Sequence, residues 1–301
     1  MIESVTLGRS DLRVSRLGFG CWQLGGHGWQ DIDQREIVAA IHLALDEGVN
    51  FFDTADVYGL GASERLLGEA LLGKSAVIAT KFGVRETGGV ATYDNSRDWL
   101  SLALEASLKR LGRDTIDLYQ LHWHDGKRPI PDILEDLERW RSQGKIRWYG
   151  ISNIDPALAG LPQGLATFTL SYNLVQRGWE QAIAQAEDKL GFMAWGALAQ
   201  GLLSGKYRRS HRFAEGDIRR RADSLFASQH WNRHDPLLAT LSTVANASQH
   251  SMAQTALRWV LDAHPGSVVL TGIKTRAQLS ENTGALGWTL PASERAALEK
   301  A

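Results

Sequence analysis

The chain has 301 residues, and its 33 Lys and Arg residues nearly balance its 34 Asp and Glu residues. This balance argues against the strongly basic surface of a protein that binds nucleic acid or an anionic membrane, and it leaves a small molecule as the expected partner. The single cysteine, Cys21, excludes an intramolecular disulfide and fits a reducing compartment.

Two further features of the sequence predict a soluble cytoplasmic protein. The start, MIESVTLGRSDL, has no basic stretch followed by an apolar run, as a secretory signal would have. No segment approaches the uninterrupted apolar length that a membrane-spanning helix requires. Because strand–helix barrels often reach this length as one unit, we expect a single domain over residues 1–301.

The predicted elements begin with a β-hairpin at residues 4–15 (SVTLGRSDLRVS), with its turn at residues 8–11, which we expect to cap one end of the fold. Eight short apolar runs follow, and most are apolar continuously, as buried parallel strands are. The runs are RLGFG at residues 16–20, VNFF ending at Phe52, AVIAT ending at Thr80, TIDLYQL ending at Leu121, and then IRWYGIS, TFTLSY, GFMAW and SVVLTG.

Longer amphipathic segments separate these strands. Residues 33–47 and 99–111 each place apolar side chains on one helical face. The segment IPDILEDLERWRSQGK predicts a bounded helix, with Pro131 in its first turn and Gly144 after its last. The apolar positions of the first two helices are Ile37, Ala40, Ile41, Ala44 and Leu45, and Leu104, Leu108 and Leu111.

Alternation of strands and helices over the whole chain predicts an α/β fold, a closed (β/α)8 TIM barrel. Two insertions interrupt the regular spacing, at residues 82–97, rich in Gly and Thr, and at residues 207–236, rich in arginine. Since long loops on the C-terminal face of such a barrel are usually functional, we place both insertions there.

Four polar side chains lie just after successive predicted strands: Asp53, Tyr58, Lys81 and His122. In a barrel these positions meet at one mouth. A lysine ammonium next to a tyrosine stabilises the phenolate, and a carboxylate keeps a buried lysine charged. We therefore expect Lys81 to make Tyr58 acidic, Asp53 to hold Lys81, and His122 to orient a carbonyl oxygen. Taken singly, each residue has a structural explanation, such as a helix cap or packing.

Six blocks of sequence, FFDTADVYG, ATKFG, LYQLHW, YGISN, SYNLVQR and AQGLLSGKY, resemble the aldo-keto reductases in their order, over essentially the whole chain. The resemblance implies an NAD(P)H-dependent oxidoreductase that reduces aldehydes or ketones, or oxidises the corresponding alcohols or sugars. It also implies that Tyr58 is the general acid or base, with catalytic roles for Asp53, Lys81 and His122.

The cofactor site follows from the same resemblance, since no Gly-x-Gly-x-x-Gly motif follows a strand. Ser152, Asn153 and Gln176 would hold the nicotinamide carboxamide, and Trp195 would stack on its ring. Asn153 has an alternative role as the cap of a helix beginning near Pro156. The other expected cofactor-binding residues are Trp22, Asp53, Gly196, Ala197, Leu198, Gly201, Leu203, Lys206, Gly272, Lys274, Thr275, Gln278, Glu281 and Asn282.

Two departures from the family pattern bear on the cofactor. Gly196 and Ala197 replace a usual Ser-Pro, which removes a hydroxyl contact. Gln278 stands where many NADP-preferring members have arginine, and an amide lacks the charged fork of a guanidinium. Lys274 and Arg276 could still neutralise a 2′-phosphate, so NADP(H) is favoured over NAD(H), with dual use open.

The expected substrate-binding residues are Trp22, Tyr58, Phe82, Arg85, His122 and Trp123, with His124 beside them. Arg85 either meets an anionic group of the substrate or is solvated. Arg219, Arg220 and Arg221 either cover the cofactor phosphates or form a solvated run of charge. We expect no metal ion.

Two alternative functions remain open at this stage. One is an NADP-binding regulatory or partner subunit with little turnover, as some family members are. The other is a barrel aldolase in which Lys81 forms a Schiff base.

Overall fold

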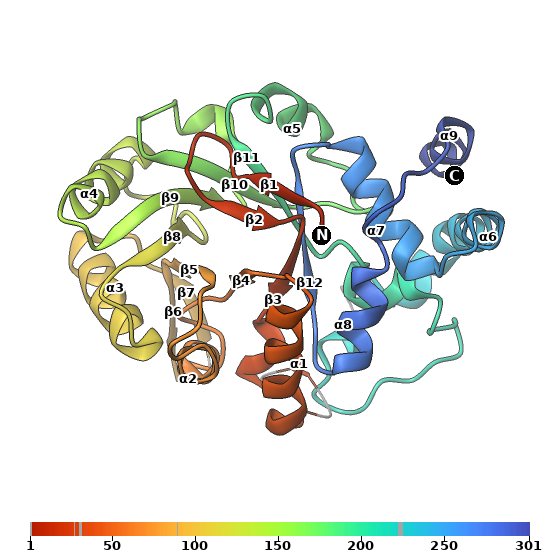
Figure 1. Ribbon diagram of the computed structural model, residues 1–301, viewed down its shortest axis with the longest axis horizontal. Coiled ribbons are helices and arrows are strands. Elements are labelled where there is room, and N and C mark those ends of the chain that lie inside the picture. Colours follow the sequence, from red (N-terminus) through yellow and green to blue (C-terminus); the bar gives the residue numbers. More distant parts are fainter. Residues whose placement is uncertain (1, 27, 30–31, 89, 222–224) are drawn as a thin grey trace.

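Eight parallel strands close into a barrel in the computed structural model, which describes residues 2–26, 28–29, 32–88, 90–221 and 225–301 (Figure 1). Each strand pairs with the next along the chain, and β12 pairs with β3 to close the circle. The predicted fold class is confirmed. The strands are β3 (Leu17–Gly20), β4 (Phe51–Asp53), β5 (Val77–Phe82), β8 (Ile116–Leu121), β9 (Ile146–Ser152), β10 (Leu165–Ser171), β11 (Gly191–Trp195) and β12 (Val268–Gly272).

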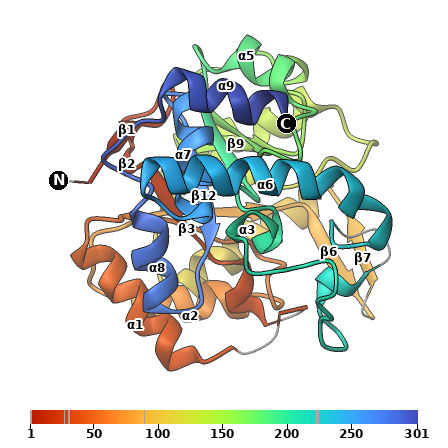
Figure 2. The same cartoon turned by 90° about the vertical axis from the view of Figure 1, so that its right-hand side faces the viewer.

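Helices surround the barrel and cover its outer surface (Figures 1 and 2). In α1 the Asp33 carboxylate caps the first turn, and Ile37, Ala40, Ile41 and Ala44 are buried as predicted. The helices are α1 (Gln34–Asp46), α2 (Ala62–Ala70), α3 (Arg97–Leu111), α4 (Ile130–Ser142), α5 (Glu180–Ala186), α6 (Trp231–Ser248), α7 (Met252–Ala263), α8 (Arg276–Thr283) and α9 (Ala292–Lys300).

The strands divide their side chains between two apolar clusters, because successive residues point to opposite faces. One cluster lies inside the barrel and includes Phe51, Ala79 and Leu118. The other lies between the strands and the helices and includes Phe52 and Ile78. The polar residues that end the strands continue the inner set, so they reach the mouth of the barrel.

The N-terminal hairpin pairs β1 (Ser4–Thr6) with β2 (Arg13–Ser15), as predicted. Gly8 in its turn has φ +50°, and a Cβ there would lie 2.2 Å from both Ala166 O and Gly191 N, at the start of β10 and β11. The turn therefore presses on the N-terminal end of the barrel. Figure 2 shows this hairpin on the opposite side of the molecule from a second hairpin, β6 (Val84–Thr87) with β7 (Val90–Tyr93), which forms most of the first insertion.

Two connections differ from the expected regular units. After β9 the chain forms only the 3₁₀ turn Pro156–Leu158, because two prolines and two glycines in residues 153–164 disfavour an α-helix. The second insertion ends before Trp231, since α6 starts there and continues through Pro236. Its residues 222–224, and residue 89 of the first insertion, lie outside the described residues.

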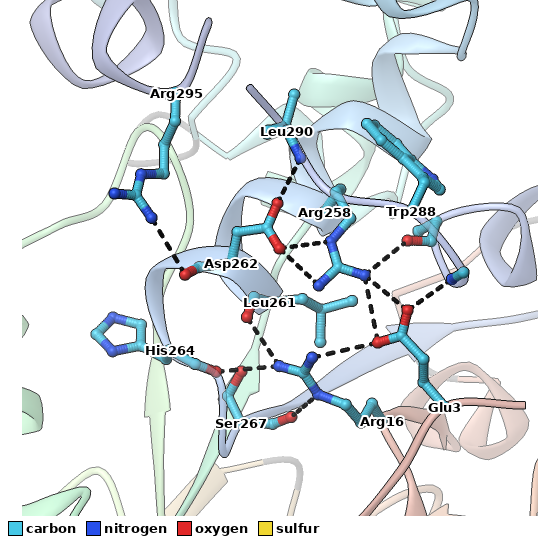
Figure 3. Close-up of polar contacts among 12 residues, drawn as sticks. Glu3, Arg16, Arg258, Leu261, Asp262, His264, Ser267, Trp288, Leu290 and Arg295 are labelled. Atoms are coloured by element: carbon cyan, nitrogen blue, oxygen red, sulfur yellow. Dashed lines mark hydrogen bonds and ion pairs between the residues drawn. The ribbon is translucent and has the colours of Figure 1, made fainter. Parts of the chain in front are cut away.

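A buried ionic network ties the hairpin to the end of the chain (Figure 3). Glu3 accepts hydrogen bonds from Arg258 Nη1 at 2.9 Å, from Arg16 Nη1 at 3.2 Å and from Gly287 N at 2.6 Å. Both guanidinium groups are buried, and Arg258 also bonds Asp262 at 2.9 Å. One carboxylate thus joins three distant segments of the sequence.

Glu3→Gln is expected to lower the free energy of unfolding at pH 7 by about 1–3 kcal/mol, because it removes a negative charge that is paired with two buried guanidinium groups. The loss is not larger because Glu3 itself is partly exposed. Burial alone would raise the pKa of Glu3, but the Gly287 amide and the two arginines lower it overall. A lowered pKa means that this stabilisation is present above the ordinary glutamate pKa of about 4.3 and disappears as pH falls through the folded-state value.

Urea unfolding of both proteins at pH 7 and at pH values descending below 4 measures the effect. The two free energies should converge in acid, when wild-type Glu3 is protonated. Glu135→Gln, on the exposed face of α4, is the control and should change little. A Glu3 effect that stays constant down to pH 3 would contradict the ionic explanation.

Candidate active site

A buried ion pair joins the ends of two neighbouring strands. Lys81 Nζ donates to Asp53 Oδ1 at 2.5 Å and to Thr54 O at 2.9 Å, and the side chains of Lys81 and Asp53 are 3% and 7% exposed. Burial alone would lower the pKa of Lys81, but Asp53 and Tyr58 raise it overall. The lysine is therefore held as an ammonium.

Two residues that the sequence analysis missed support this pair. Gln120 donates from Nε2 to the second oxygen of Asp53 at 3.3 Å, and Thr169 Oγ1 donates to Gln120 Oε1 at 2.7 Å. Both are fully buried. Their signal in the sequence is polarity inside otherwise apolar strands, with the same inward parity as the site residues. They fix the carboxylate and therefore the lysine.

The Tyr58 ring lies against this ion pair. Lys81 Nζ is 5.4 Å from the ring centroid, and the His122 ring meets the Tyr58 ring edge-on at 5.8 Å. Trp22 lies on another side, at 6.3 Å between ring centroids. The barrel thus brings Asp53, Tyr58, Lys81 and His122 together, from β4, the turn after it, β5 and the end of β8.

Backbone contact between two loops holds Tyr58 in place. A Cβ on Gly25 would lie 2.6 Å from Tyr58 C and from Gly59 N, and a Cβ on Gly59 would lie 2.3 Å from Gly25 O. Only glycine permits so close an approach. The loop after β3 therefore supports the turn that carries the phenol.

The protonation of Tyr58 differs from the expectation. Burial raises the pKa of the phenol above its ordinary value, and the Lys81 ammonium lowers it by less. The expected direction of the lysine effect is correct, but desolvation is larger. His122 has a pKa well below the ordinary value, because burial disfavours its charged form and Lys81 repels it. At neutral pH the site therefore contains a protonated phenol and a neutral imidazole.

A second polar group lies beside His122, at the ends of β9 and β11. Asn153 donates from Nδ2 to Ser152 Oγ at 3.0 Å and to His122 O at 3.2 Å, and its Oδ1 accepts from Trp195 Nε1 at 2.9 Å. Asp155, not Asn153, caps the turn at Pro156, so the capping alternative is wrong. Ser152, Asn153 and Trp195 thus form one connected group.

Gln176 is held on the same face through Asn173, which the sequence analysis missed. Asn173 is fully buried. Its Nδ2 donates to Gln176 Oε1 at 3.0 Å and to Gly196 O at 2.9 Å, and its Oδ1 accepts from the backbone N of Gln176 at 2.9 Å. Ser171 Oγ also donates to Gln176 Oε1 at 3.3 Å. Asn173 therefore joins the loop after β10 to the loop after β11.

The loop after β11 has an unusual backbone. Positive φ values occur at Gly196, Ala199, Gln200, Gly201 and Gly205, and two of these residues carry side chains. Successive left- and right-handed residues form concavities of N–H groups that suit anions. This loop also contains the predicted residues Ala197, Leu198, Leu203 and Lys206, of which Ala197 and Leu203 are buried.

The predicted adenosine end lies after β12 and is already well bonded within the chain. Thr275 Oγ1 caps α8 by accepting a hydrogen bond from the backbone N of Gln278 at 3.2 Å. The side-chain Oε1 of Gln278 accepts from Lys274 N at 2.7 Å. Glu281 accepts from Ser251 Oγ, and Asn282 is buried. The segment is a fixed turn that leads into a helix.

These residues fit a nicotinamide dinucleotide on two structural grounds. A Cβ on Gly272 would lie 1.8 Å from Gln23 Nε2, so only glycine leaves room for the Gln23 amide, whose buried Oε1 accepts no hydrogen bond from the described residues. Gln200 Oε1, in the loop of positive φ, is buried and accepts no hydrogen bond from the described residues. Two buried acceptors without partners are features of a site built for a polar ligand.

Two arginines that could meet cofactor phosphates are engaged with other groups. Arg276 is paired with Glu36 of α1 at 3.1 Å. Arg219 bonds Asp217 at 2.6 Å and Tyr207 Oη at 2.6 Å, and its side chain is 12% exposed, so the solvated alternative is wrong for it. Arg219 also lies over the ring of Trp29, at 5.5 Å, and thereby attaches the second insertion to the loop after β3.

Among the predicted substrate residues, Trp22 and Trp123 are partly exposed, whereas Phe82 is buried. Trp22 is 36% exposed beside Tyr58, and Trp123 is half-buried and stacks on Tyr93 at 5.8 Å. Phe82 is a correction, because alternation along β5 turns it away from Lys81, and its fully buried ring stacks on Tyr119 at 4.6 Å.

Arg85 lies over the ring of Trp99 at 4.9 Å, with Asp94 3.5 Å away. It lines a cavity of about 510 Å³ between β6–β7 and the loop after β8. Lys127 and Arg128 line the same cavity. His124 bonds Arg128 O, and so faces this loop.

In the described part of the chain, no helix is long and apolar enough to cross a membrane. The same residues include no group of three or more His, Cys, Asp or Glu side chains that could hold a metal ion.

Comparison with known proteins agrees with this geometry. The profile of the Aldo/keto reductase family matches residues 16–301. The aldo-keto reductase YhdN of Bacillus subtilis is 32% identical, over 98% of this chain and 92% of the relative. The Schizosaccharomyces pombe aldo-keto reductase yakc [NADP(+)] is 32% identical, over 91% and 84%. The structure of a glycerol dehydrogenase from Gluconobacter oxydans has a TM-score of 0.88 at 32% identity, covering 99% of this chain and 94% of that one. The chain therefore belongs to the aldo-keto reductase family, and is an NAD(P)-dependent oxidoreductase that acts on carbonyl or CH–OH groups.

Proposed function

We propose that this protein reduces aldehydes or ketones, or oxidises the corresponding alcohols or sugars, with Tyr58 as the general acid or base. The observation that carries the proposal is the convergence of the Tyr58 ring with Lys81 Nζ at 5.4 Å and with the His122 ring at 5.8 Å. A phenol, an ammonium and a neutral imidazole at one mouth can move a proton to or from a substrate oxygen.

The bound nicotinamide would supply or accept the hydride at the substrate carbon. In reduction, the protonated Tyr58 donates its proton to the substrate oxygen as that oxygen gains charge. Lys81 lowers the free energy of the phenolate that remains, and Asp53 keeps Lys81 charged. His122, being neutral, donates an N–H to the same oxygen and orients it. In oxidation, Tyr58 first loses its proton to solvent, and the phenolate, stabilised by Lys81, then accepts the alcohol proton.

Ser152, Asn153 and Gln176 would hold the carboxamide of the nicotinamide, with Trp195 against the ring. Their connected hydrogen bonds at the ends of β9, β10 and β11 support this assignment. We propose NADP(H) as the favoured cofactor over NAD(H), because Lys274 lies at the adenosine end and the S. pombe relative is named for NADP(+). The proposed compartment is the cytoplasm.

A panel of carbonyl and alcohol substrates, assayed with both NADPH and NADH, tests the proposed function. Turnover that requires the cofactor would support it. Tight dinucleotide binding with no turnover on the whole panel would favour the regulatory subunit instead.

The aldolase alternative has its own test, which is borohydride trapping of a substrate on Lys81. A Schiff base forms from a neutral amine, whereas Lys81 is held as an ammonium by Asp53. We therefore expect no trapped adduct.

Arg85→Ala is expected to lower kcat/KM for aldehydes that carry a carboxylate by about 5- to 50-fold, and to leave neutral aldehydes within about twofold. Loss of one charge-assisted hydrogen bond, weakened here by exposure and by Asp94, gives this range. Steady-state kinetics on matched pairs of charged and neutral aldehydes measure it. Equal losses on both kinds would show that Arg85 has no role in binding the anion.

A further inference from the structure

A carboxylate from α1 lies on the first residue of α8. Glu36 Oε1 accepts from the Arg276 backbone N at 3.0 Å and from Arg276 Nε at 3.2 Å, and Glu36 Oε2 accepts from Arg276 Nη2 at 3.1 Å. The guanidinium fork and the backbone amide of the helical first turn are thus both directed at one internal anion. A phosphate would use the same two donors.

Glu36 is fixed in this position by its own helix. It lies in the first turn of α1, two residues after the start, and its backbone amide donates to the Asp33 cap at 3.4 Å. Hydrogen bonds from Arg276 hold the pKa of Glu36 below its ordinary range. The carboxylate therefore stays charged and in place at neutral pH.

The segment that contains Arg276, residues 272–282, has no second arginine to offset the negative charge of Glu36. Gln278 carries a neutral amide, and its Oε1 accepts from Lys274 N at 2.7 Å. Asp217, in the second insertion, is paired with its own guanidinium, that of Arg219, at 2.6 Å. At residues 272–282 the guanidinium available to a phosphate is therefore that of Arg276, which Glu36 already occupies.

We propose that Glu36 discriminates against the 2′-phosphate of NADP(H) by occupying Arg276, and so raises the relative use of NAD(H). The inference rests on the proposed function, which places the adenosine ribose at residues 272–282. A 2′-phosphate carries a charge of about −1.5 to −2 and is repelled by a fixed carboxylate. A ribose 2′-hydroxyl is neutral and can donate a hydrogen bond to it, as acidic residues accept from ribose in unrelated dinucleotide folds.

The test compares the binding of four probes by isothermal titration calorimetry: NADP⁺, NAD⁺, 2′,5′-ADP and 5′-ADP. Glu36→Gln keeps the shape of the side chain and a carbonyl that can accept from Arg276, so the contact between α1 and α8 remains. The variant should bind NADP⁺ and 2′,5′-ADP on the order of tenfold more tightly than wild type. Its affinity for NAD⁺ and 5′-ADP should be unchanged or slightly lower.

Glu47→Gln is the matched control, because Glu47 also joins α1 to α8. Its carboxylate accepts from Thr283 Oγ1 at 3.3 Å, at the opposite ends of both helices. Glu47 is eleven positions after Glu36, a distance of about 16 Å along the helix. Removing this charge should leave the affinities for all four probes unchanged.

The double variant Glu36→Gln/Arg276→Gln tests how Glu36 acts. If loss of the Glu36 charge releases the guanidinium for the phosphate, removing Arg276 as well should reverse the gain for NADP⁺ and 2′,5′-ADP. A gain that persists in the double variant would overturn the inference.

Failure of the inference is distinguishable from failure of the proposed function. If wild type binds NAD⁺ and NADP⁺ but Glu36→Gln leaves their ratio unchanged, the inference is overturned and the proposed function stands. If wild type binds neither dinucleotide, both are overturned.

Discussion

Tyr58→Phe is expected to lower kcat by about 10²- to 10⁴-fold, the range for loss of a general acid or base. The phenylalanine ring keeps the contacts with His122 and Trp22, at 5.8 and 6.3 Å, so the shape of the mouth is retained. Only the phenolic hydroxyl is lost. Because the proposed mechanism has the phenol act on the substrate, the affinity for the dinucleotide should stay within about twofold.

Steady-state kinetics give kcat, and calorimetric titration with NADP⁺ gives the affinity of the same protein. Tyr93→Phe is the control, since Tyr93 lies on the same face of the barrel, stacked on Trp123 at 5.8 Å. It should lose less than about threefold. Unchanged turnover in Tyr58→Phe would remove Tyr58 from the proposed mechanism, and loss of cofactor binding would assign it a structural role.

Lys81→Met has the largest expected effect on stability. The variant leaves the Asp53 carboxylate buried beside Gln120 without its cation, and breaking a buried pair in this way costs about 3–5 kcal/mol. Turnover should fall as well, because the phenolate of Tyr58 loses the charge that stabilises it. Urea unfolding and kinetics on the same preparation measure the two effects.

The double variant Asp53→Asn/Lys81→Met separates stability from catalysis. It removes both charges, so it should recover most of the free energy of unfolding, while kcat stays low. Recovery of turnover together with stability would show that Lys81 acts only through the fold. Full stability in Lys81→Met alone would contradict the importance of the ion pair.

The barrel itself could be predicted from local patterns. Continuous apolar runs alternate with amphipathic helices whose ends carry local signals, such as the Asp33 cap of α1 and Pro131 in the first turn of α4. These signals lie within a few residues of one another, so they are legible without coordinates. The exception after β9, where proline and glycine replace a helix, also has its cause in the composition of residues 153–164.

The gathering of Asp53, Tyr58, Lys81 and His122 could also be predicted, because each follows the end of a strand and barrel strands end at one mouth. Phe82 was wrongly predicted to bind substrate. Side chains alternate along β5, so Phe82 points to the opposite face of the strand from Lys81. Gln120, Thr169 and Asn173 were missed. A polar residue inside a strand does not reveal its partner, which lies on another strand or in another loop.

Local patterns in the amino-acid chain thus account for the order of the elements, the end of the barrel where the candidate catalytic side chains gather, and the types of chemical group found there. The environment of those groups depends on the closed fold. Desolvation, rather than Lys81, sets the direction of the Tyr58 pKa, and Arg276 meets Glu36 across 240 positions of the chain. Backbone propensity and periodicity act between near neighbours, whereas burial and charge pairing depend on which distant segments the barrel brings into contact.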